Sequence, residues 1–315
     1  MSPDAVDMIR STSLATLLSL PLYLAATAAL AQQPARTGIM IMAHGGISEW
    51  DQAVAEAIQP IKERIPTALA LGMADPHTMQ AALDSLAAQG VEKFAVVRLF
   101  LSGESFLHDT EFYLRLREDA PVMTMAMMVS HGSGQPHDIA PPQPLNLSGE
   151  ILLETRGLSE APEVAEIVGH RAKHVSVDPA SESVIVVAHG MGDEGENQRL
   201  LDHMEASLEQ LRRAGFKDVR SATLREDWPE ARKVAADDIR AWVGSRAERG
   251  DRVIVVPFRL FGFGRYAEVL SGLEYVPADG LLPHDLVSEW VAQSAADLFC
   301  AQGIANPLRS CTPAH

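Results

Sequence analysis

Basic residues are scarce in this chain of 315 residues. Lys and Arg number 26 against 42 Asp and Glu, which gives a formal charge of -16. Because a phosphate-binding surface needs a basic stripe, this balance argues against a nucleic-acid partner, and it also disfavours adsorption to anionic lipid. It does not exclude an acidic small-molecule substrate, since a local basic pocket can bind one within an acidic protein.

Long hydrophobic runs are scarce too, and the one that approaches spanning length lies at the start. It covers residues 14–30, follows Met8-Ile9-Arg10 and ends in the small-x-small sequence Ala29-Leu30-Ala31. This pattern predicts a signal peptide over residues 1–31. A membrane anchor is the alternative, but Pro21 and the limited length argue against it. We expect a periplasmic mature protein with no stable membrane insertion after signal removal.

Cysteine is limited to Cys300 and Cys311, both near the C-terminus. An oxidising compartment makes a short-range disulfide between them plausible, and such a bond would hold the C-terminal tail. Two free thiols are the alternative, because sequence spacing cannot show whether the Cα atoms come within bonding distance.

Two continuous apolar runs, residues 38–43 and 184–188, have the pattern of parallel strands covered by helices on both faces. Each run ends in Ala-His-Gly, and each opens a half of the chain in which strands and helices alternate. Such alternation predicts an α/β fold with an open parallel sheet flanked by helices in each half. We therefore predict two tandem domains, at residues 32–149 and 150–315.

The remaining elements follow from periodicity and from helix-start signals. In the first domain we expect strands at 68–71, 93–101 and a Met-rich strand at 122–129, with helices at 48–64, after Asp75-Pro76 and from about 107. In the second we expect strands at 219–224, 252–258 and near 273–276, with helices at 194–214, after Asp227-Trp228-Pro229, and from about 265 and 285. A helix at 161–174 could close either half.

Three histidines are predicted at the carboxyl ends of strands, where ligands gather in open α/β sheets. His44 and His189 end the two apolar runs, and His108 lies just beyond the strand 93–101. A neutral imidazole can bind a divalent metal or accept a proton near physiological pH. Aligning Gly103 with Gly262 sets Ala267 opposite His108, so the second half keeps one histidine and lacks its partner.

A strand that ends in His-Gly, followed 64 residues later by a His beyond an apolar strand and a Gly-containing loop, is similar to the class II tetrapyrrole chelatases, the sirohydrochlorin cobaltochelatase and ferrochelatase family. The resemblance covers residues 38–300, and residues 157–190 resemble the double-domain members. It implies two chelatase-like domains with a cleft between them that holds a sirohydrochlorin-like tetrapyrrole.

The resemblance also implies insertion of a divalent metal substrate, Co²⁺ first and Fe²⁺ or Ni²⁺ next, with no nucleotide. His44 and His108 are then the metal ligands and catalytic bases, since metallation releases two N–H protons. The loop Gly45–Glu49 departs from the Ser-Arg that this family usually carries there, and Gly103 lies further from His108 than in a tight Gly-x-His.

The predicted export conflicts with the cytoplasmic pathways that this family serves. A periplasmic carrier of metal or tetrapyrrole, with the same fold but no turnover, is therefore the alternative function. A third reading is a structural domain with no small ligand.

Other residues are weaker candidates. Substrate carboxylates could bind Arg98, Arg259, Arg265 and His189, the arginines lying near strand ends. His170 and His174 have a zinc-binding i, i+4 spacing, but no Glu follows as a zincin requires, so a solvated helix face is favoured.

Gly262–Ala267 fits a dinucleotide pattern only loosely. Two further groups are more simply explained as loop residues or strand core: His131, His137 and Asp138, and the Met123–Met128 cluster.

Overall fold

The computed structural model describes residues 35–120 and 141–311. The predicted signal peptide, the Met-rich strand at 122–129 and the loop group containing His131 and His137 lie outside these residues. Among the residues that the model describes, no helix combines the length and the apolar character needed to cross a membrane.

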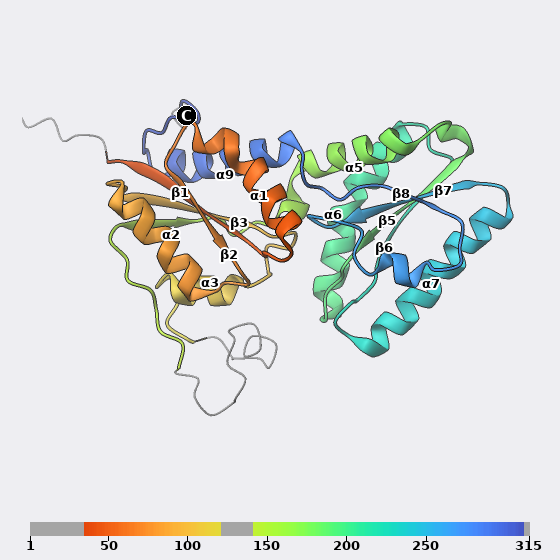
Figure 1. Cartoon of the computed structure of the whole chain (residues 1–315), viewed down its shortest axis with the longest axis horizontal. Helices are drawn as coiled ribbons and strands as arrows, with labels where there is room; N and C mark the ends of the chain where they lie inside the picture. Colours follow the sequence, from red (N-terminus) through yellow and green to blue (C-terminus); the bar gives the residue numbers. More distant parts are fainter. Residues whose placement is uncertain (1–34, 121–140, 312–315) are drawn as a thin grey trace, which may run out of the picture. The chain divides into compact units, whose positions relative to one another are not determined.

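Two four-stranded sheets, all parallel, form the framework (Figure 1). The first has the order β2-β1-β3-β4 and the second the order β6-β5-β7-β8, so the predicted repeat and the α/β fold class are confirmed. The strands of the first sheet are β1 (Thr37–Ala43), β2 (Thr67–Leu71), β3 (Lys93–Leu99) and β4 (Glu150–Leu153). Those of the second are β5 (Glu182–Ala188), β6 (Asp218–Thr223), β7 (Arg252–Phe258) and β8 (Val276–Pro277).

Helices cover both faces of these sheets, and the Asp75-Pro76 start predicted from the sequence is confirmed, whereas the Asp193 cap is a finding of the structure. The Asp75 side chain accepts a hydrogen bond from the His77 amide and Pro76 opens the helix, while Asp193 accepts from the Glu196 amide. The α-helices are α1 (Ser48–Lys62), α2 (Pro76–Ala88), α3 (Leu107–Tyr113), α5 (Pro162–Val175), α6 (Glu194–Arg213), α7 (Pro229–Glu248), α8 (Tyr266–Val269) and α9 (Asp285–Ala301). Two 3-10 turns, Leu158–Glu160 and Pro179–Ser181, precede α5 and β5.

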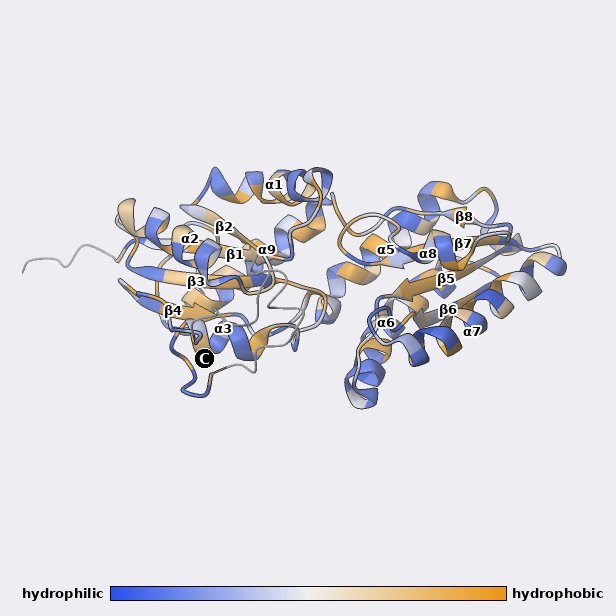
Figure 2. Cartoon of the chain, turned by 60° about the horizontal axis from the view of Figure 1, so that its bottom comes forward, coloured by the Kyte–Doolittle hydropathy of each residue, from blue (hydrophilic) through white to orange (hydrophobic). Residues whose placement is uncertain are grey.

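The apolar runs at 38–43 in β1 and 184–188 in β5 are continuous because both faces of these strands are buried. In β1, Ile39 and Ile41 pack into one core cluster and Met40 and Met42 into another on the opposite face. The strand β5 alternates between two clusters in the same way. In Figure 2, β5 has hydrophobic colours, whereas the helices alternate between hydrophilic and hydrophobic residues. The sequence pattern of a doubly covered parallel strand is thereby explained.

The two sheets exchange their closing helices. The helix α5 follows β4 of the first sheet but packs on β7 and α6, whereas α9 follows β8 of the second sheet and packs on α1, β3 and β4. The predicted boundary between residues 149 and 150 also precedes β4, which pairs with β3. The first half is therefore built from two separate stretches of chain, β1 to β4 and α9, whereas the second half is one continuous stretch from α5 to β8.

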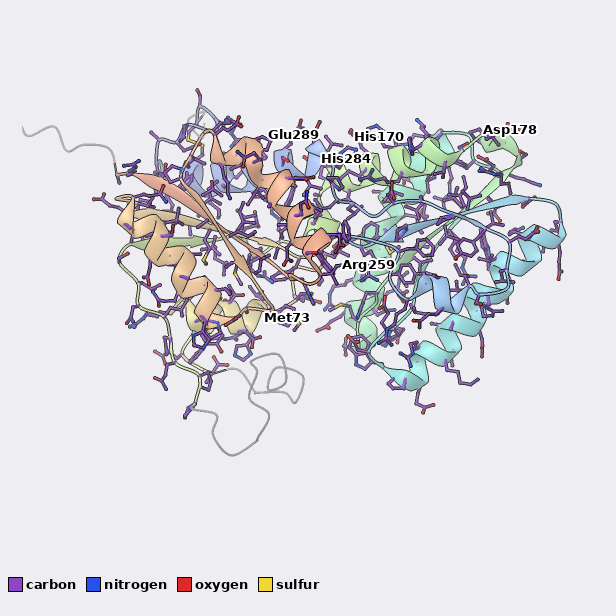
Figure 3. All side chains as sticks on the ribbon, in the orientation of Figure 1. Met73, His170, Asp178, Arg259, His284 and Glu289 are labelled. Carbon is purple, nitrogen blue, oxygen red and sulfur yellow. A yellow bond between two sulfur atoms is a disulfide. The ribbon has the colours of Figure 1, made fainter. Side chains whose placement is uncertain are left out.

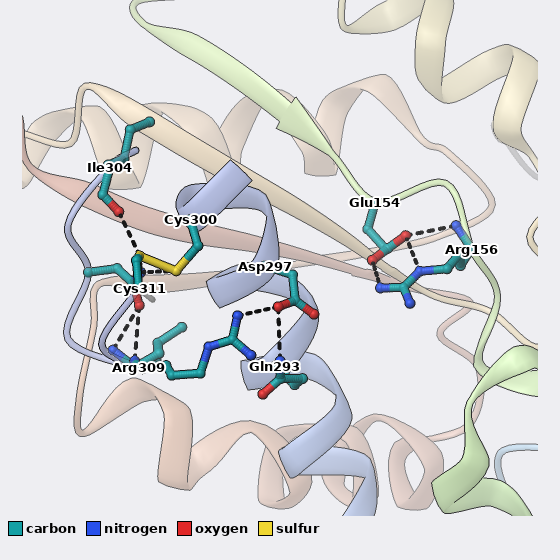
Figure 4. Close-up of polar contacts among 10 residues, drawn as sticks. Glu154, Arg156, Gln293, Asp297, Cys300, Ile304, Arg309 and Cys311 are labelled. Carbon is teal, nitrogen blue, oxygen red and sulfur yellow. Dashed lines mark hydrogen bonds and ion pairs between the residues drawn. A yellow bond between two sulfur atoms is a disulfide. The ribbon is translucent and has the colours of Figure 1, made fainter. Parts of the chain in front are cut away.

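The disulfide between Cys300 and Cys311 is formed, with Cα atoms 5.2 Å apart. It joins the end of α9 to the tail, and Arg64 at the end of α1 donates to the Leu308 carbonyl. Figure 4 shows Arg309 of the same tail paired with Asp297 of α9. The tail is thus held against the first sheet's helical layer.

A buried carboxylate at the start of β5 leads to a pH-dependent prediction. Glu182 is fully buried and accepts hydrogen bonds from Ser176, the Val177 amide at 2.9 Å and Arg252 at 2.6 Å. Burial raises its pKa, but these three donors outweigh burial, so its pKa lies below the ordinary value. The unfolded state therefore binds more protons than the folded state in acid. The stability that ionised Glu182 contributes is present above its unfolded pKa and is lost as the pH falls through its folded pKa.

We expect Glu182→Gln to lower the free energy of unfolding by about 2 kcal/mol at pH 7, because a neutral amide replaces a charged acceptor of buried donors. Urea denaturation at pH 7 and pH 3.5 measures this, and the difference from wild type should shrink at the lower pH. An equal difference at both values would contradict the assignment.

Candidate functional site

The two Ala-His-Gly segments adopt the same local structure at the carboxyl ends of β1 and β5. Gly45 and Gly190 have φ angles of 69° and 88°, a left-handed conformation that glycine adopts at little cost. This turn brings the glycine carbonyl oxygen to 2.9 Å from Nδ1 of His44 and to 2.8 Å from Nδ1 of His189. Since a carbonyl oxygen only accepts, Nδ1 carries the proton, and a neutral ring presents its lone pair at Nε2.

His44 is the more exposed of the two histidines. The residue is exposed, and its ring stacks on Trp50 of α1 with centroids 5.3 Å apart. Trp50 in turn lies 6.4 Å from the ring of Phe261, in the loop after β7. Among residues 35–120 and 141–311, no protein group forms a hydrogen bond with His44 Nε2. This nitrogen can therefore bind a metal ion or accept a proton without first losing a protein partner.

In His189 both ring nitrogens are engaged. Nε2 lies 3.1 Å from a carboxylate oxygen of Asp227, and the ring meets the edge of Trp228 with centroids 6.0 Å apart. The Asp227-Trp228-Pro229 sequence predicts a helix start and gives no sign that Asp227 contacts His189. A metal could reach His189 Nε2 only by displacing Asp227.

His108 lies in the first turn of α3, beyond the neighbouring strand. Its Nε2 is 3.1 Å from the Asp119 carboxylate, which also pairs with Arg117 at 2.9 Å. Ala43 of β1 is in register with Leu99 of β3, so the loops that carry His44 and His108 leave the same edge of the sheet. The two histidines have separate contacts, and their joint role in metal binding stays a prediction. In the described part of the chain, no group of three or more His, Cys, Asp or Glu residues is placed to hold a metal.

Arg98 has a structural position that the sequence did not reveal. It is 1% exposed, and its guanidinium donates to the main-chain carbonyls of Gly103 at 2.9 Å, Thr155 at 3.3 Å and Ser105. Burial lowers its pKa to about 10. The prediction that Arg98 contacts a substrate carboxylate does not fit this placement, because the main chain takes up its donors. It instead ties the loop after β3 to the segment after β4.

The other two predicted arginines differ from each other. Arg259, labelled in Figure 3, lies 3.6 Å from the Glu226 carboxylate and over the ring of Tyr266 at 5.8 Å. Both neighbours are buried, and burial raises the pKa of Tyr266. Arg259 is thus half-buried beside Glu226, with Nε and Nη1 that have no hydrogen-bond partner among the described residues, whereas Arg265 at the start of α8 is exposed. Of the two, Arg265 is the better placed for an external carboxylate.

A cavity of about 320 Å³ lies between α6 and the loops that follow β3 and β4. Arg199 of α6 donates to Glu104 at 3.0 Å, and His203 lies 3.1 Å from the Ser159 hydroxyl. Burial, followed by the charge of Glu104, raises the pKa of Glu196 on the same wall. The lining of the cavity includes Leu107 but neither His44 nor His108. No distinctive sequence pattern marks this cavity, because its polar residues come from three segments that are far apart in the chain.

No protein-family model matches the chain, and no curated protein matches it. Its fold is similar to that of SirB from Bacillus subtilis with Fe³⁺, at 17% identity and a TM-score of 0.59, covering 86% of this chain and 99% of that chain. The sirohydrochlorin chelatase SirB from Bacillus subtilis subspecies spizizenii in complex with cobalt has 14% identity, the same coverage and a TM-score of 0.56. DR2241 from Deinococcus radiodurans, a multi-domain protein with structural similarity to chelatases, has 18% identity and a TM-score of 0.51, over 83% of this chain and 55% of that one. The chain therefore has the two-domain fold of the class II chelatases.

Proposed function

We propose that this protein is an exported chelatase that inserts a divalent metal, Co²⁺ first and Fe²⁺ or Ni²⁺ next, into a sirohydrochlorin-like tetrapyrrole. The observation that carries the proposal is the exposed Nε2 of His44 at the carboxyl end of β1. The fold supports it, because the chelatase structures similar to this one are described with iron or cobalt. The periplasmic location rests on the predicted signal peptide at residues 1–31.

The chemistry needs a weak metal ligand and a base. A chelatase must hold its metal through few, exchangeable ligands so that the ion can pass to the macrocycle, and the macrocycle releases two N–H protons. His44 Nε2 has one lone pair, so it serves these tasks in sequence: it delivers the metal and then accepts a proton. His108 is the proposed second ligand and base, and it must release Asp119 to act.

The second half has a supporting role in this proposal. The Asp227 carboxylate contacts His189 Nε2, the nitrogen that a metal would need. Ala267 occupies the position that corresponds to His108 of the first half. Exposed Arg265 is the proposed partner of a peripheral carboxylate of the macrocycle, since Arg259 faces Glu226.

The alternative is a carrier that binds metal or tetrapyrrole without turnover. It is favoured by one observation: among the residues described, only His44 of the two proposed ligands has an Nε2 without a protein contact. A single open imidazole can bind a ligand, but it supplies one base for two protons.

Absorbance spectroscopy of the purified protein with sirohydrochlorin and Co²⁺ distinguishes these functions. We expect metallated product to form faster than without protein and to exceed the protein concentration many times. Saturation at one equivalent without product would favour the carrier. If the protein neither binds its ligands nor forms product, both proposals are contradicted.

A further inference from the structure

Two histidines from the exchanged helices meet at the start of α9. His170 of α5 and His284, the residue before α9, have Nδ1 and Nε2 3.2 Å apart, and Figure 3 shows them side by side. Their ring centroids are 5.4 Å apart with planes inclined by 20°. The distance between the two nitrogens plus the two ring radii nearly equals the distance between the centroids, so both nitrogens lie on the line that joins the ring centres. The rings therefore lie end to end. Their nitrogens thus face each other as in a hydrogen bond and do not converge on a third point.

The direction of this hydrogen bond follows from the helix cap. His284 Nδ1 accepts the amide proton of Leu286 at 3.2 Å, so the proton of a neutral His284 must be on Nε2. It is therefore donated to Nδ1 of His170. Protonating His284 on Nδ1 would remove the acceptor of the cap, and protonating His170 on Nδ1 would place two N–H groups face to face. Both contacts require two neutral rings.

The pair lies where the chain passes from the second sheet to the first. α5 packs on β7 and α6, whereas α9 packs on α1, β3 and β4. The neighbouring Arg171 donates to the carbonyls of Gly280 at 2.7 Å and Pro283 at 2.6 Å, which holds the segment before α9 on α5. The start of α9 is thus attached to α5 by Arg171, which stays charged, and by the His170–His284 pair, which can titrate.

Charged groups around His284 come from both helices. Glu166, His170 and Arg171 face it from α5 and Asp285 from α9, while α1 meets α9 through the Ala57 carbonyl, which accepts from Ser288. Burial, then Arg171 and His170, lower the pKa of His284, and Asp285 and Glu166 oppose them. The unfolded state therefore binds the proton more readily. The stability from neutral His284 is complete above its ordinary pKa of about 6.5 and is lost as the pH falls.

We propose that the His170–His284 pair is a proton-operated latch: it fixes the start of α9 on α5 at neutral pH and releases it in acid. The latch is independent of whether the protein is a chelatase or a carrier. The latch joins α9, which packs on the first sheet, to α5, which packs on the second. Its release would weaken this connection and leave His44 unchanged.

Hydrogen exchange of the mature protein tests the latch through the amides at residues 284–290. After correction for the intrinsic exchange rate, we expect protection of the Leu286 amide to fall about five- to tenfold between pH 8 and pH 5, the size of a lost helix cap. His284→Asn should abolish this pH dependence, since an asparagine oxygen can cap the helix but does not titrate in this range. His174→Asn, one turn along α5 on an exposed position, is the matched control and should behave like wild type.

The same pH dependence in His284→Asn as in wild type would overturn the proposal. Nitrogen NMR of the wild-type imidazoles gives a test that needs no variant. At pH 8 the proton of His284 should be on Nε2, and finding it on Nδ1 would also overturn the latch.

Discussion

Replacing His44 by alanine is expected to lower the rate of metal insertion about a hundredfold or more, the usual effect of removing a positioned base. The side chain is exposed, and within residues 35–120 and 141–311 its hydrogen bond is to the Gly45 carbonyl and its ring contact is with Trp50, so the change should cost little stability. The measurement is the initial rate of Co²⁺ insertion into sirohydrochlorin, followed by absorbance and compared with the uncatalysed rate. Added imidazole should restore part of the activity, because it can supply the missing nitrogen.

Two other histidine variants serve as controls for His44→Ala. His189→Ala should have a smaller effect on the rate, because Asp227 already occupies its Nε2. His174→Ala, at an exposed position on α5, should have none. An undiminished rate in His44→Ala would contradict the proposed site, as would an equal loss in all three variants.

Replacing Arg98 by leucine is expected to lower the free energy of unfolding by about 3–5 kcal/mol, because three main-chain carbonyls would lose their donor at about 1–3 kcal/mol each. Leucine cannot donate, so the carbonyls of Gly103, Ser105 and Thr155 would each lose a buried partner. Urea denaturation at pH 7 measures the change. Arg98→Lys should recover part of the loss, because one ammonium keeps the charge but cannot span three carbonyls as a planar guanidinium does.

The matched control for this stability change is Arg213→Leu on α6. Arg213 is exposed and pairs with Glu209 one turn away, so its loss should cost less than about 0.5 kcal/mol. Equal losses in Arg98→Leu and Arg213→Leu would contradict the structural role of Arg98. The loop that Arg98 holds leads to His108 and contributes Gly103 to the cavity, so the folded fraction of Arg98→Leu should also show slower metal insertion.

Several features were predictable because they depend on local patterns. The runs at 38–43 and 184–188 are apolar at every position, which indicates strands buried on both faces. Asp75-Pro76 marks a helix start because the Asp75 carboxylate accepts from the His77 amide and the Pro76 ring fixes a helical φ angle. Because His44 and His189 directly follow these runs, the sequence alone places them at the carboxyl ends of strands.

Other features depend on contacts between distant segments, which local patterns do not encode. An arginine in a strand reads as a surface charge, but Arg98 is buried because loop carbonyls supply its acceptors. The His-Gly repeats look equivalent, yet Asp227 from another strand end occupies only His189. An amphipathic helix shows which face is buried but not which sheet buries it.

The sequence by itself determined two parallel sheets, their helices and a histidine at the end of each central strand, since strand and helix periodicities are local properties. Only the tertiary structure decided that α5 and α9 exchange sheets, that His44 alone of the repeated pair has an open Nε2, and that His170 meets His284 from 114 residues away. The reason is physical: side-chain periodicity selects an element, whereas the partner of each polar atom is set by packing between elements remote in the chain.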